Sequence, residues 1–210
     1  CSSDLWRFGT PFIFEVRDLW PQTLIDLGKI SPNGFAARAM RILERFLYRR
    51  ARRIISLLPR AGEYITNTGI PAERVVWIPN GVEPGPKPIT APPRGSGQCV
   101  FMYFGAHGQA NGLSNLLHAM GLARNDPTCS GLYLRLVGDG PAKASLQQLS
   151  ITLGLDNVRF EPPVAKMAIP ALAAEADAFI FNLVDAPVFR YGISSNKLFD
   201  FLAAGRPIVF

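Results

Sequence analysis

Short apolar runs alternate with segments of helical periodicity along most of the chain. Before residue 84, apolar runs of strand length occupy residues 12–16, 54–58 and 75–78. After residue 97 the alternation is strict, with strands predicted at residues 100–104, 133–137, 158–160, 178–183 and 208–210 and helices predicted at residues 111–123, 142–153, 169–176 and 197–204. Such alternation with short connections implies an α/β fold with parallel, doubly wound sheets, whose ligands bind at the carboxyl ends of the strands.

Residues 84–97 interrupt this pattern. They read PGPKPITAPPRGSG, and so many prolines and glycines are typical of a linker. We therefore expect two domains, residues 1–83 and residues 98–210, on either side of it. The chain has no initiator Met, and its last residues continue a strand pattern, so we expect it to be an internal piece of a longer protein.

The last twenty residues, YGISSNKLFDFLAAGRPIVF, contain the main candidate for a binding site. A polar turn precedes the helix predicted at residues 197–204, and the free N–H groups and the dipole of a helix start attract a phosphate. The residues that we assign to this phosphate site are Ser194, Ser195, Asn196 and Lys197, with Asp200 one turn further on as a partner for a ribose hydroxyl. The alternative is a serine-capped helix that only packs Leu198, Phe199 and Leu202 on a sheet.

Glycine-bearing turns follow two of the predicted strands. Gly105, His107 and Gly108 follow strand 100–104, and Gly138 and Gly140 follow strand 133–137. Glycines let a ligand approach the backbone closely, and a histidine in such a turn can donate a hydrogen bond to a phosphate. Neither turn has the full Gly-x-Gly-x-x-Gly pattern, so ordinary loops with a solvated histidine remain the competing interpretation.

Residues 35–51 form the clearest predicted helix. Its apolar face consists of Phe35, Ala39, Ile42, Leu43, Phe46 and Leu47. The adjacent stripe is basic and consists of Arg38, Arg41, Arg45, Arg49 and Arg52. Arginines beside an apolar face are typical of a helix that lies on an anionic membrane surface. A helix packed on the core with a solvated basic face gives the same pattern, so both interpretations stay open.

Charge and cysteine content narrow the range of partners. The 22 Lys and Arg against 16 Asp and Glu give a net charge of +6, which favours phosphorylated ligands or an acidic membrane surface. Nucleic acid is the weaker option, because no basic motif interleaved with aromatic residues is present. The three cysteines show no paired or metal-type spacing, which favours a reduced, cytosolic compartment. No apolar run approaches the ~20 residues of a membrane span.

Five motifs resemble those of glycosyltransferase family 4. They are RDLWP at residues 17–21, ERFLYRRARRI at 44–54, IPNGVE at 78–83, VGDGP at 137–141 and GISSNKLFDFLAAGRPIV at 192–209. The chain is most similar to bacterial sugar transferases of O-antigen and colanic-acid synthesis, including the N-acetylfucosamine transferase type. The resemblance covers nearly the whole chain and implies the GT-B architecture. Residues 1–83 would then be the end of an acceptor-side Rossmann-like domain, and residues 98–210 most of the nucleotide-sugar-binding one.

The resemblance also implies a reaction. Family members transfer a sugar with retention, without a metal or other cofactor, here from a UDP- or GDP-sugar to a lipid-linked or saccharide acceptor on the inner face of the plasma membrane. Arg17 aligns with a catalytic histidine of many members, and Arg17 and Asp18, which end strand 12–16, are the catalytic candidates, although a strand-end ion pair is a serious alternative. The expected donor-binding residues are Gly105, His107, Gly108, Gly138, Gly140, Val164, Ser194, Ser195, Asn196, Lys197 and Asp200.

Departures from the family pattern keep other functions open. Where many members have an arginine and a lysine for the diphosphate, this chain has Ala106 and Asn111, and Lys197 is the candidate replacement. A non-catalytic nucleotide-binding or membrane-docking module and a sugar-nucleotide epimerase on the same fold are the alternatives. Because the start of the first domain and the closing C-terminal helices of the family are missing, we expect the 210-residue chain alone to aggregate and not to transfer sugar.

Overall fold

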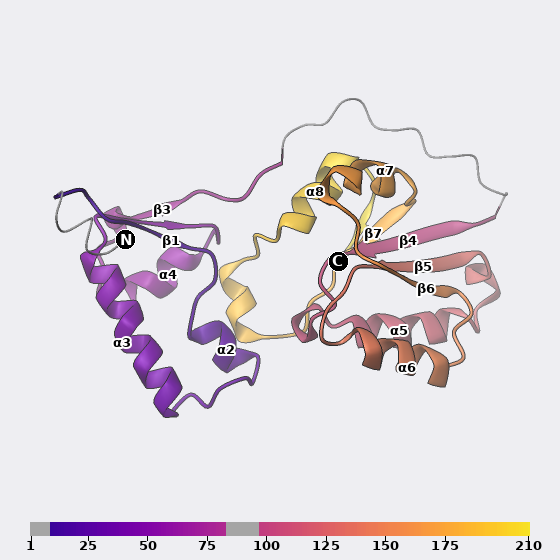
Figure 1. The fold of residues 1–210 in the computed structure, drawn as a ribbon, viewed down its shortest axis with the longest axis horizontal. Helices are drawn as coiled ribbons and strands as arrows, with labels where there is room; N and C mark the ends of the chain where they lie inside the picture. Colours follow the sequence, from indigo (N-terminus) through magenta and orange to yellow (C-terminus); the bar gives the residue numbers. More distant parts are fainter. Residues whose placement is uncertain (1–8, 83–96) are drawn as a thin grey trace. The chain divides into compact units, whose positions relative to one another are not determined.

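The computed structural model describes residues 9–82 and 97–210, and Figure 1 shows its elements. Contacts within the chain define two compact units. The first contains the residues up to Asn80 together with Asp185–Ser195, and the second contains Gly81–Val184 and Asn196–Phe210. The predicted linker lies outside the described residues except for Gly97. Each unit is described by itself.

The first unit is built on a parallel sheet with the strand order β1-β2-β3. The strands are β1 (Ile13–Val16), β2 (Arg53–Ser56) and β3 (Val75–Trp77). Helices α2 (Gln22–Asp26) and α3 (Phe35–Arg50) connect β1 to β2, and α4 (Ala61–Thr66) and the 3₁₀ turn η1 (Ala72–Arg74) connect β2 to β3. Val16 and Ile54 are buried while Ile13 and Arg53 are exposed, so these strands bury one face. The apolar residues Phe12, Phe14 and Ile55 are half-buried.

Helix α3 turns its apolar stripe away from the core. Its buried residues are Ala37, Glu44 and Tyr48, and the Tyr48 hydroxyl donates to the Glu44 carboxylate over 3.2 Å. Burial raises the pKa of Glu44. The exposed apolar residues are Phe35, Ile42, Leu43 and Phe46, with exposed fractions of 88, 71, 56 and 53%. The stripe therefore belongs to the surface of this unit, and the core contact runs through a different set of residues.

Residues 185–195 fold with the first unit although they lie between two strands of the other sheet. The 3₁₀ segment η5 (Pro187–Tyr191) packs on α2 and α4, and the Arg60 amide donates to the Tyr191 carbonyl over 2.9 Å. The Asn80 side-chain amide donates to the Ser194 carbonyl over 2.6 Å, and its backbone N–H donates to the Ser194 hydroxyl over 3.2 Å. This unit is therefore not contiguous in sequence, unlike the expected domain of residues 1–83, because residues 185–195 pack on residues that precede Gly81.

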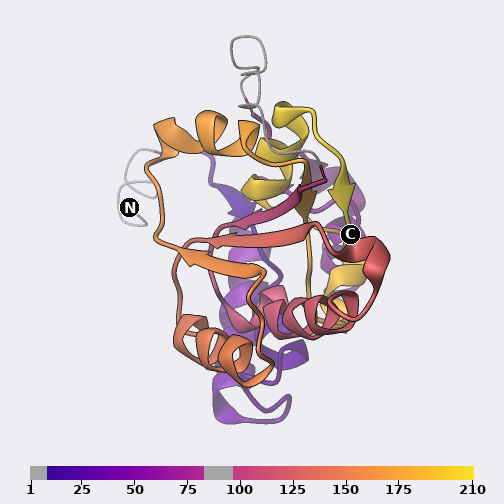
Figure 2. The same ribbon diagram turned by 90° about the vertical axis from the view of Figure 1, so that its right-hand side faces the viewer.

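The second unit has a five-stranded parallel sheet with the order β6-β5-β4-β7-β8. The strands are β4 (Cys99–Phe104), β5 (Leu132–Val137), β6 (Val158–Glu161), β7 (Ala178–Ile180) and β8 (Ile208–Val209). The helices are α5 (Leu113–Ala123), α6 (Lys143–Thr152), α7 (Ile169–Ala174) and α8 (Asn196–Ala204), with 3₁₀ turns η2 (Gln109–Asn111), η3 (Pro127–Cys129) and η4 (Lys166–Ala168). Figures 1 and 2 show α5 and α6 on one face of the sheet and α7 and α8 on the other.

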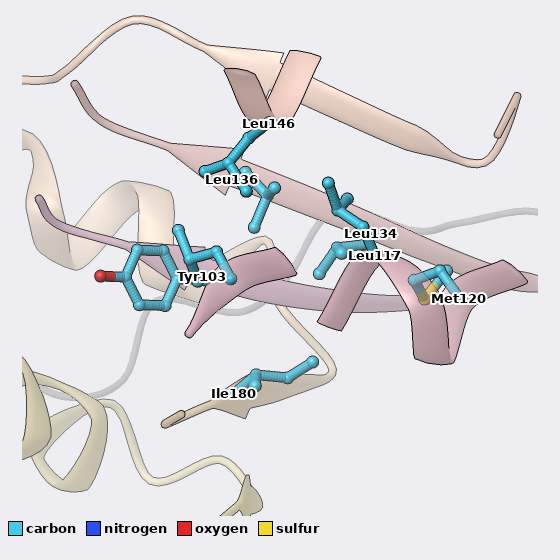
Figure 3. Packing of buried hydrophobic residues seen from close by; sticks show 8 residues of the cluster. Tyr103, Leu117, Met120, Leu134, Leu136, Leu146 and Ile180 are labelled. Carbon is cyan, nitrogen blue, oxygen red and sulfur yellow. The ribbon is translucent and has the colours of Figure 1, made fainter. Parts of the chain in front are cut away.

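The core on the α5 and α6 side is an aliphatic cluster around one tyrosine. Figure 3 shows Tyr103 of β4 among Leu117, Leu134 and Leu136, with its hydroxyl pointing away from them. On the other face, Phe201 of α8 stacks on Phe179 at 4.4 Å between ring centroids. Phe201 is fully buried and Leu198 and Phe199 are half-buried, whereas Leu202 is 60% exposed, so the alternative interpretation of this helix is wrong for Leu202. The aromatic stack fixes α8 on the sheet and with it the position of Lys197.

Candidate functional site

The order of the second sheet defines where a ligand would bind. From β4 the chain proceeds outward to β5 and β6, and then returns to the other side of β4 to form β7 and β8. In such sheets the crevice lies at the carboxyl ends of the two strands where the direction reverses, here β4 and β7. The turn after β4 contains Gly105, His107 and Gly108. The segment after β7 is tied to it, because the Asn182 side-chain amide donates to the Gly112 carbonyl over 2.8 Å.

The glycines of the two predicted turns allow the turns to contact each other. The Gly105 amide donates to the Val137 carbonyl over 2.9 Å, and the His107 amide donates to the Asp139 carbonyl over 2.8 Å. A Cβ atom on Gly138 would overlap the Gly105 carbonyl oxygen, and one on Gly140 would lie 2.7 Å from the His107 oxygen. Their prediction as ligand contacts stays untested. The structure gives these two glycines a packing reason that the sequence did not reveal.

Lys197 lies at the crevice and is the predicted site residue with the most informative contacts. Its Nζ donates to the Tyr103 hydroxyl over 2.7 Å and to the Asn111 Oδ1 over 2.6 Å. The same nitrogen lies 4.4 Å from the centre of the Tyr103 ring and 5.7 Å from that of Phe181. Lys197 therefore reaches from the start of α8 to the turn after β4, whose residue Asn111 we had matched to the position of a family lysine.

The Lys197 ammonium has no carboxylate partner within the part of the chain that the structure describes. Burial lowers the pKa of Lys197 to about 8. A buried cation held only by neutral groups pays a desolvation cost that a bound anion removes. The crevice therefore suits an anionic ligand.

His107 is fully buried beneath the same turn. Its ring lies 6.1 Å from that of Tyr103 and 6.2 Å from that of Phe160, measured between centroids. Neither ring nitrogen has a hydrogen-bond partner among the described residues. Burial, with the nearby Lys143 ammonium, lowers the pKa of His107, which keeps the ring neutral. We predicted a hydrogen bond from His107 to a phosphate, and that stays a prediction.

The other predicted donor residues are divided between the two units. Gly108, Val164, Asn196 and Asp200 belong to the second, where Val164 is 39% exposed beyond β6 and burial raises the pKa of Asp200. Ser194 and Ser195 belong to the first unit, and the Ser194 hydroxyl accepts from Asn80. The structure thus brings Lys197, Gly105 and His107 together within the second unit, and it assigns the two serines to the first.

Arg17 and Asp18 follow β1 in the first unit, as predicted, and both are exposed. Arg17 forms an ion pair with Glu15, with 3.1 Å between Nε and Oε1. This is the strand-end ion pair that we weighed against a catalytic role. It leaves that role untested, because both side chains are largely solvent-accessible and free to rearrange.

Sequence reasoning missed Tyr103 as a site residue. We interpreted Tyr103 as one apolar position of strand 100–104. Only the alternation of side chains along the strand indicates that Tyr103 points inward. Lys143 was also missed, although its Nζ donates to the Gly138 carbonyl over 2.7 Å and stabilises the second turn. The described residues contain no group of three His, Cys, Asp or Glu side chains that could hold a metal ion. Within the same residues, no helix has the length and apolar character needed to cross a membrane.

The comparisons with known proteins agree with this arrangement. The profile described as "Glycosyl transferases group 1" matches residues 98–210, and that described as "Glycosyl transferase 4-like domain" matches residues 3–81. The chain belongs to the group 1 glycosyltransferases. This group 1 chain is 26% identical over 215 residues to the probable glycosyltransferase WbjE of Pseudomonas aeruginosa, covering 97% of the chain and 52% of WbjE. It therefore spans about half the length of that relative.

A second relative is the putative colanic acid biosynthesis glycosyl transferase WcaI of Escherichia coli (strain K12). It is 30% identical over 106 residues, which cover 50% of this group 1 chain and 25% of WcaI. The resemblance to sugar transferases is thus confirmed at the level of the family, and the N-acetylfucosamine type is not.

Solved glycosyltransferases share the fold. Anabaena Alr3699/HepE in complex with UDP-glucose superimposes with a TM-score of 0.69 at 20% identity, over 99% of this chain and 55% of that one. WaaG, a glycosyltransferase involved in lipopolysaccharide biosynthesis, gives a TM-score of 0.68 at 15% identity, over 99% and 61%. Together with the parallel sheets of three and five strands, these similarities establish the predicted GT-B fold class with Rossmann-like domains.

Proposed function

We propose that the second unit of this glycosyltransferase binds the diphosphate of a UDP- or GDP-sugar at Lys197. The observation that carries the proposal is the desolvated Lys197 ammonium, which lacks a carboxylate partner in the described chain and lies at the crevice between β4 and β7. The UDP in the Alr3699/HepE complexes supports UDP as the first nucleotide to test. Asp200, three residues further along α8, is the candidate partner of the ribose.

The proposed reaction is transfer of a hexosyl or acetamidosugar residue with anomeric retention. Departure of the nucleotide places negative charge on the diphosphate, and a fixed ammonium stabilises that charge more in the transition state than in the ground state. Arg17 and Asp18 are the proposed catalytic residues of the acceptor side. No step requires a metal or another cofactor.

The proposed acceptor is a lipid-linked or other saccharide of cell-envelope polysaccharide synthesis, as in the synthesis of O-antigen or of exopolysaccharides. The lipopolysaccharide and colanic acid assignments of WaaG and WcaI support this class. The proposed location is the cytoplasm, at the inner face of the plasma membrane. A purely nucleotide-binding module would bind UDP but not transfer sugar, and an epimerase would convert the donor without an acceptor.

Calorimetry with UDP, GDP, UMP and uridine tests the donor site. We expect the 210-residue chain to bind one of the two diphosphates at least about tenfold more tightly than the monophosphate, because the ammonium adds a charge-assisted contact of about 1.5–3 kcal/mol. Sugar transfer is then assayed separately. Equal affinity for UDP and uridine, and for GDP and guanosine, would remove the diphosphate from the proposal.

The affinity for UDP should depend on pH above about 8. The free site holds Lys197 with a pKa of about 8, and a bound diphosphate raises this pKa, so binding takes up a proton at higher pH. The affinity should be constant between about pH 7 and 8 and fall by up to tenfold for each further pH unit, because one proton is taken up. In Lys197→Met this decline should disappear; a decline that persists would assign it to another group.

Helix α3 supports the membrane part of the proposal. Its exposed residues Ile42 and Phe46 lie beside Arg45, Arg49 and Arg50 and line a surface groove with them. Arg38, Arg45 and Arg49 are exposed, whereas the predicted lipid contact Arg41 donates to the Pro32 carbonyl over 2.9 Å and is half-buried. We propose that α3 lies on an anionic lipid surface, with the apolar residues inserted and the three exposed arginines on the headgroups.

Vesicle sedimentation tests this contact. The variant Ile42→Ser/Phe46→Ser should lower partitioning onto vesicles that contain anionic lipid by about tenfold or more, since each half-inserted side chain contributes on the order of 1 kcal/mol. The matched control is Leu122→Ser/Ile151→Ser, two side chains that are 76 and 71% exposed on helices of the other unit. Charge reversal at Arg45 and Arg49 should have a similar effect that salt reproduces. An equal loss of vesicle partitioning in the control variant, or no vesicle binding by the wild-type protein, would reject the contact of α3 with the lipid surface.

A further inference from the structure

Four groups form a closed ring of hydrogen bonds at the crevice of the second unit. The Lys197 Nζ donates to the Tyr103 hydroxyl over 2.7 Å and to the Asn111 Oδ1 over 2.6 Å. The Tyr103 hydroxyl donates to the Ala106 carbonyl over 2.7 Å, and the Asn111 Nδ2 donates to the same oxygen over 2.9 Å. The ring therefore fixes the ammonium from two sides and ties it to the turn after β4.

Both side-chain acceptors of the ring are neutral. Burial raises the pKa of Tyr103, so its hydroxyl stays protonated, and an asparagine amide carries no charge. His107 lies within electrostatic reach of Lys197, and its lowered pKa leaves it uncharged at neutral pH. An ammonium has three N–H donors, and the ring uses two of them. One donor and the full positive charge remain for a ligand.

The lack of a side chain at Gly105 leaves room for this ring of hydrogen bonds. The φ of +136° at Gly105 is one that residues with a side chain rarely adopt. A Cβ atom there would lie 3.7 Å from the Lys197 Cδ and Cε atoms and from the Tyr103 hydroxyl, so side chains longer than alanine would press on the ring. The turn is therefore built around the ring.

We propose that Tyr103 and Asn111 are positioning residues that hold the Lys197 ammonium in place without neutralising it, so that its charge is reserved for a diphosphate. This inference rests on the proposed function and adds two residues to it. Neither touches the ligand in this scheme. Both act through Lys197. Tyr103 holds the ammonium over its aromatic ring. Asn111 accepts a hydrogen bond from the ammonium, and a carboxylate at this position would form an ion pair instead.

The substitution Asn111→Asp tests the need for a neutral acceptor. It keeps the shape of the side chain and adds a negative charge beside Lys197, which competes with the diphosphate. We expect the affinity for UDP to fall by about tenfold or more, and the pKa of Lys197 to rise. Asn111→Ala removes the hydrogen bond without adding charge and should cost less affinity than Asn111→Asp. A role that is only structural predicts the opposite order, because the ion pair would restore what alanine removes.

Tyr103→Phe tests the other half of the ring. It removes only the hydroxyl, and the phenyl group still fills the space within the aliphatic cluster, so the fold should persist. We expect a severalfold loss of UDP affinity, seen in a transfer assay as a raised donor KM with a smaller change in kcat. The matched control is Tyr133→Phe, a half-exposed tyrosine of β5, which should leave both unchanged. Equal effects in the two variants would reject a positioning role for Tyr103.

Two readouts separate this inference from the donor assignment. The pKa of Lys197, followed by NMR of ¹³C-labelled lysine without nucleotide, reports the ring alone. An unchanged pKa in Asn111→Asp would reject the ring. Binding of inorganic pyrophosphate reports the anion site without a nucleoside. Suppose that the wild-type protein binds pyrophosphate but neither UDP nor GDP, and that Asn111→Asp weakens the binding of pyrophosphate. The nucleotide-sugar proposal then fails, and the positioning role stands. If the wild-type protein binds none of the three, both are wrong.

Discussion

Replacement of Lys197 by methionine should lower the affinity for UDP by about 10- to 100-fold. Methionine keeps the apolar part of the side chain and removes the ammonium, with its charge and its hydrogen bonds to Tyr103 and Asn111. The expected loss corresponds to about 1.4–2.7 kcal/mol, close to the range for a hydrogen bond to a charged group. Calorimetry at pH 7 measures it.

The control for this variant removes a positive charge elsewhere on the same unit. Arg159 on β6 has an 80% exposed side chain, and its Nε lies 3.7 Å from the Glu161 Oε1. Arg159→Met should change UDP affinity by less than about twofold, because exposed charges at a distance are screened by salt. If the two variants lose affinity equally, Lys197 contributes only to the general field of a basic protein and is not the diphosphate ligand.

Replacement of Gly138 by alanine should destabilise the second unit by about 3 kcal/mol or more. The φ of +145° at Gly138 is unfavourable for alanine, at a cost of roughly 1–2 kcal/mol. The new Cβ would also overlap the Gly105 carbonyl oxygen, and such overpacking typically costs about 1–3 kcal/mol more. The midpoint of urea unfolding measures the loss.

Gly205→Ala separates the two contributions. Gly205 ends α8 with a φ of +64°, and nothing lies within 4 Å of the Cβ position. This variant should therefore cost only about 1 kcal/mol, the conformational part. If Gly138→Ala loses no more stability than Gly205→Ala, the contact between the two turns is loose. Gly138 would then be explained by the role that the sequence suggested, which is to let the ligand approach the backbone.

Most elements of both sheets could be predicted because apolar periodicity is a local signal. The helix at residues 197–204, for example, was placed from a polar start and from Gly205, and the structure has Asn196–Ala204. Strand pairing was inferred from the β/α alternation, which permits few topologies. The same reasoning placed Lys197 at the start of a helix on the crevice edge.

Contacts between distant parts of the chain could not be predicted in this way. Tyr103 and Lys197 are 94 residues apart, and nothing in either local pattern points to the other. The apolar stripe of α3 shows the second limit. Periodicity identified that Ile42 and Phe46 share a face, but a periodic face does not reveal what covers it, and here the core contact runs through Ala37, Glu44 and Tyr48.

The inclusion of residues 185–195 in the first unit has a consequence for synthesis on the ribosome. A domain formed by contiguous residues can fold as soon as its last strand has emerged, and N-terminal domains usually fold first. Here Asn80 and Arg60 must wait for Ser194 and Tyr191, more than one hundred residues later, before their hydrogen bonds can form. The first unit is thus completed only after nearly all of the second sheet has been translated, so a nascent chain arrested before residue 185 should hold it unfinished and open to proteases.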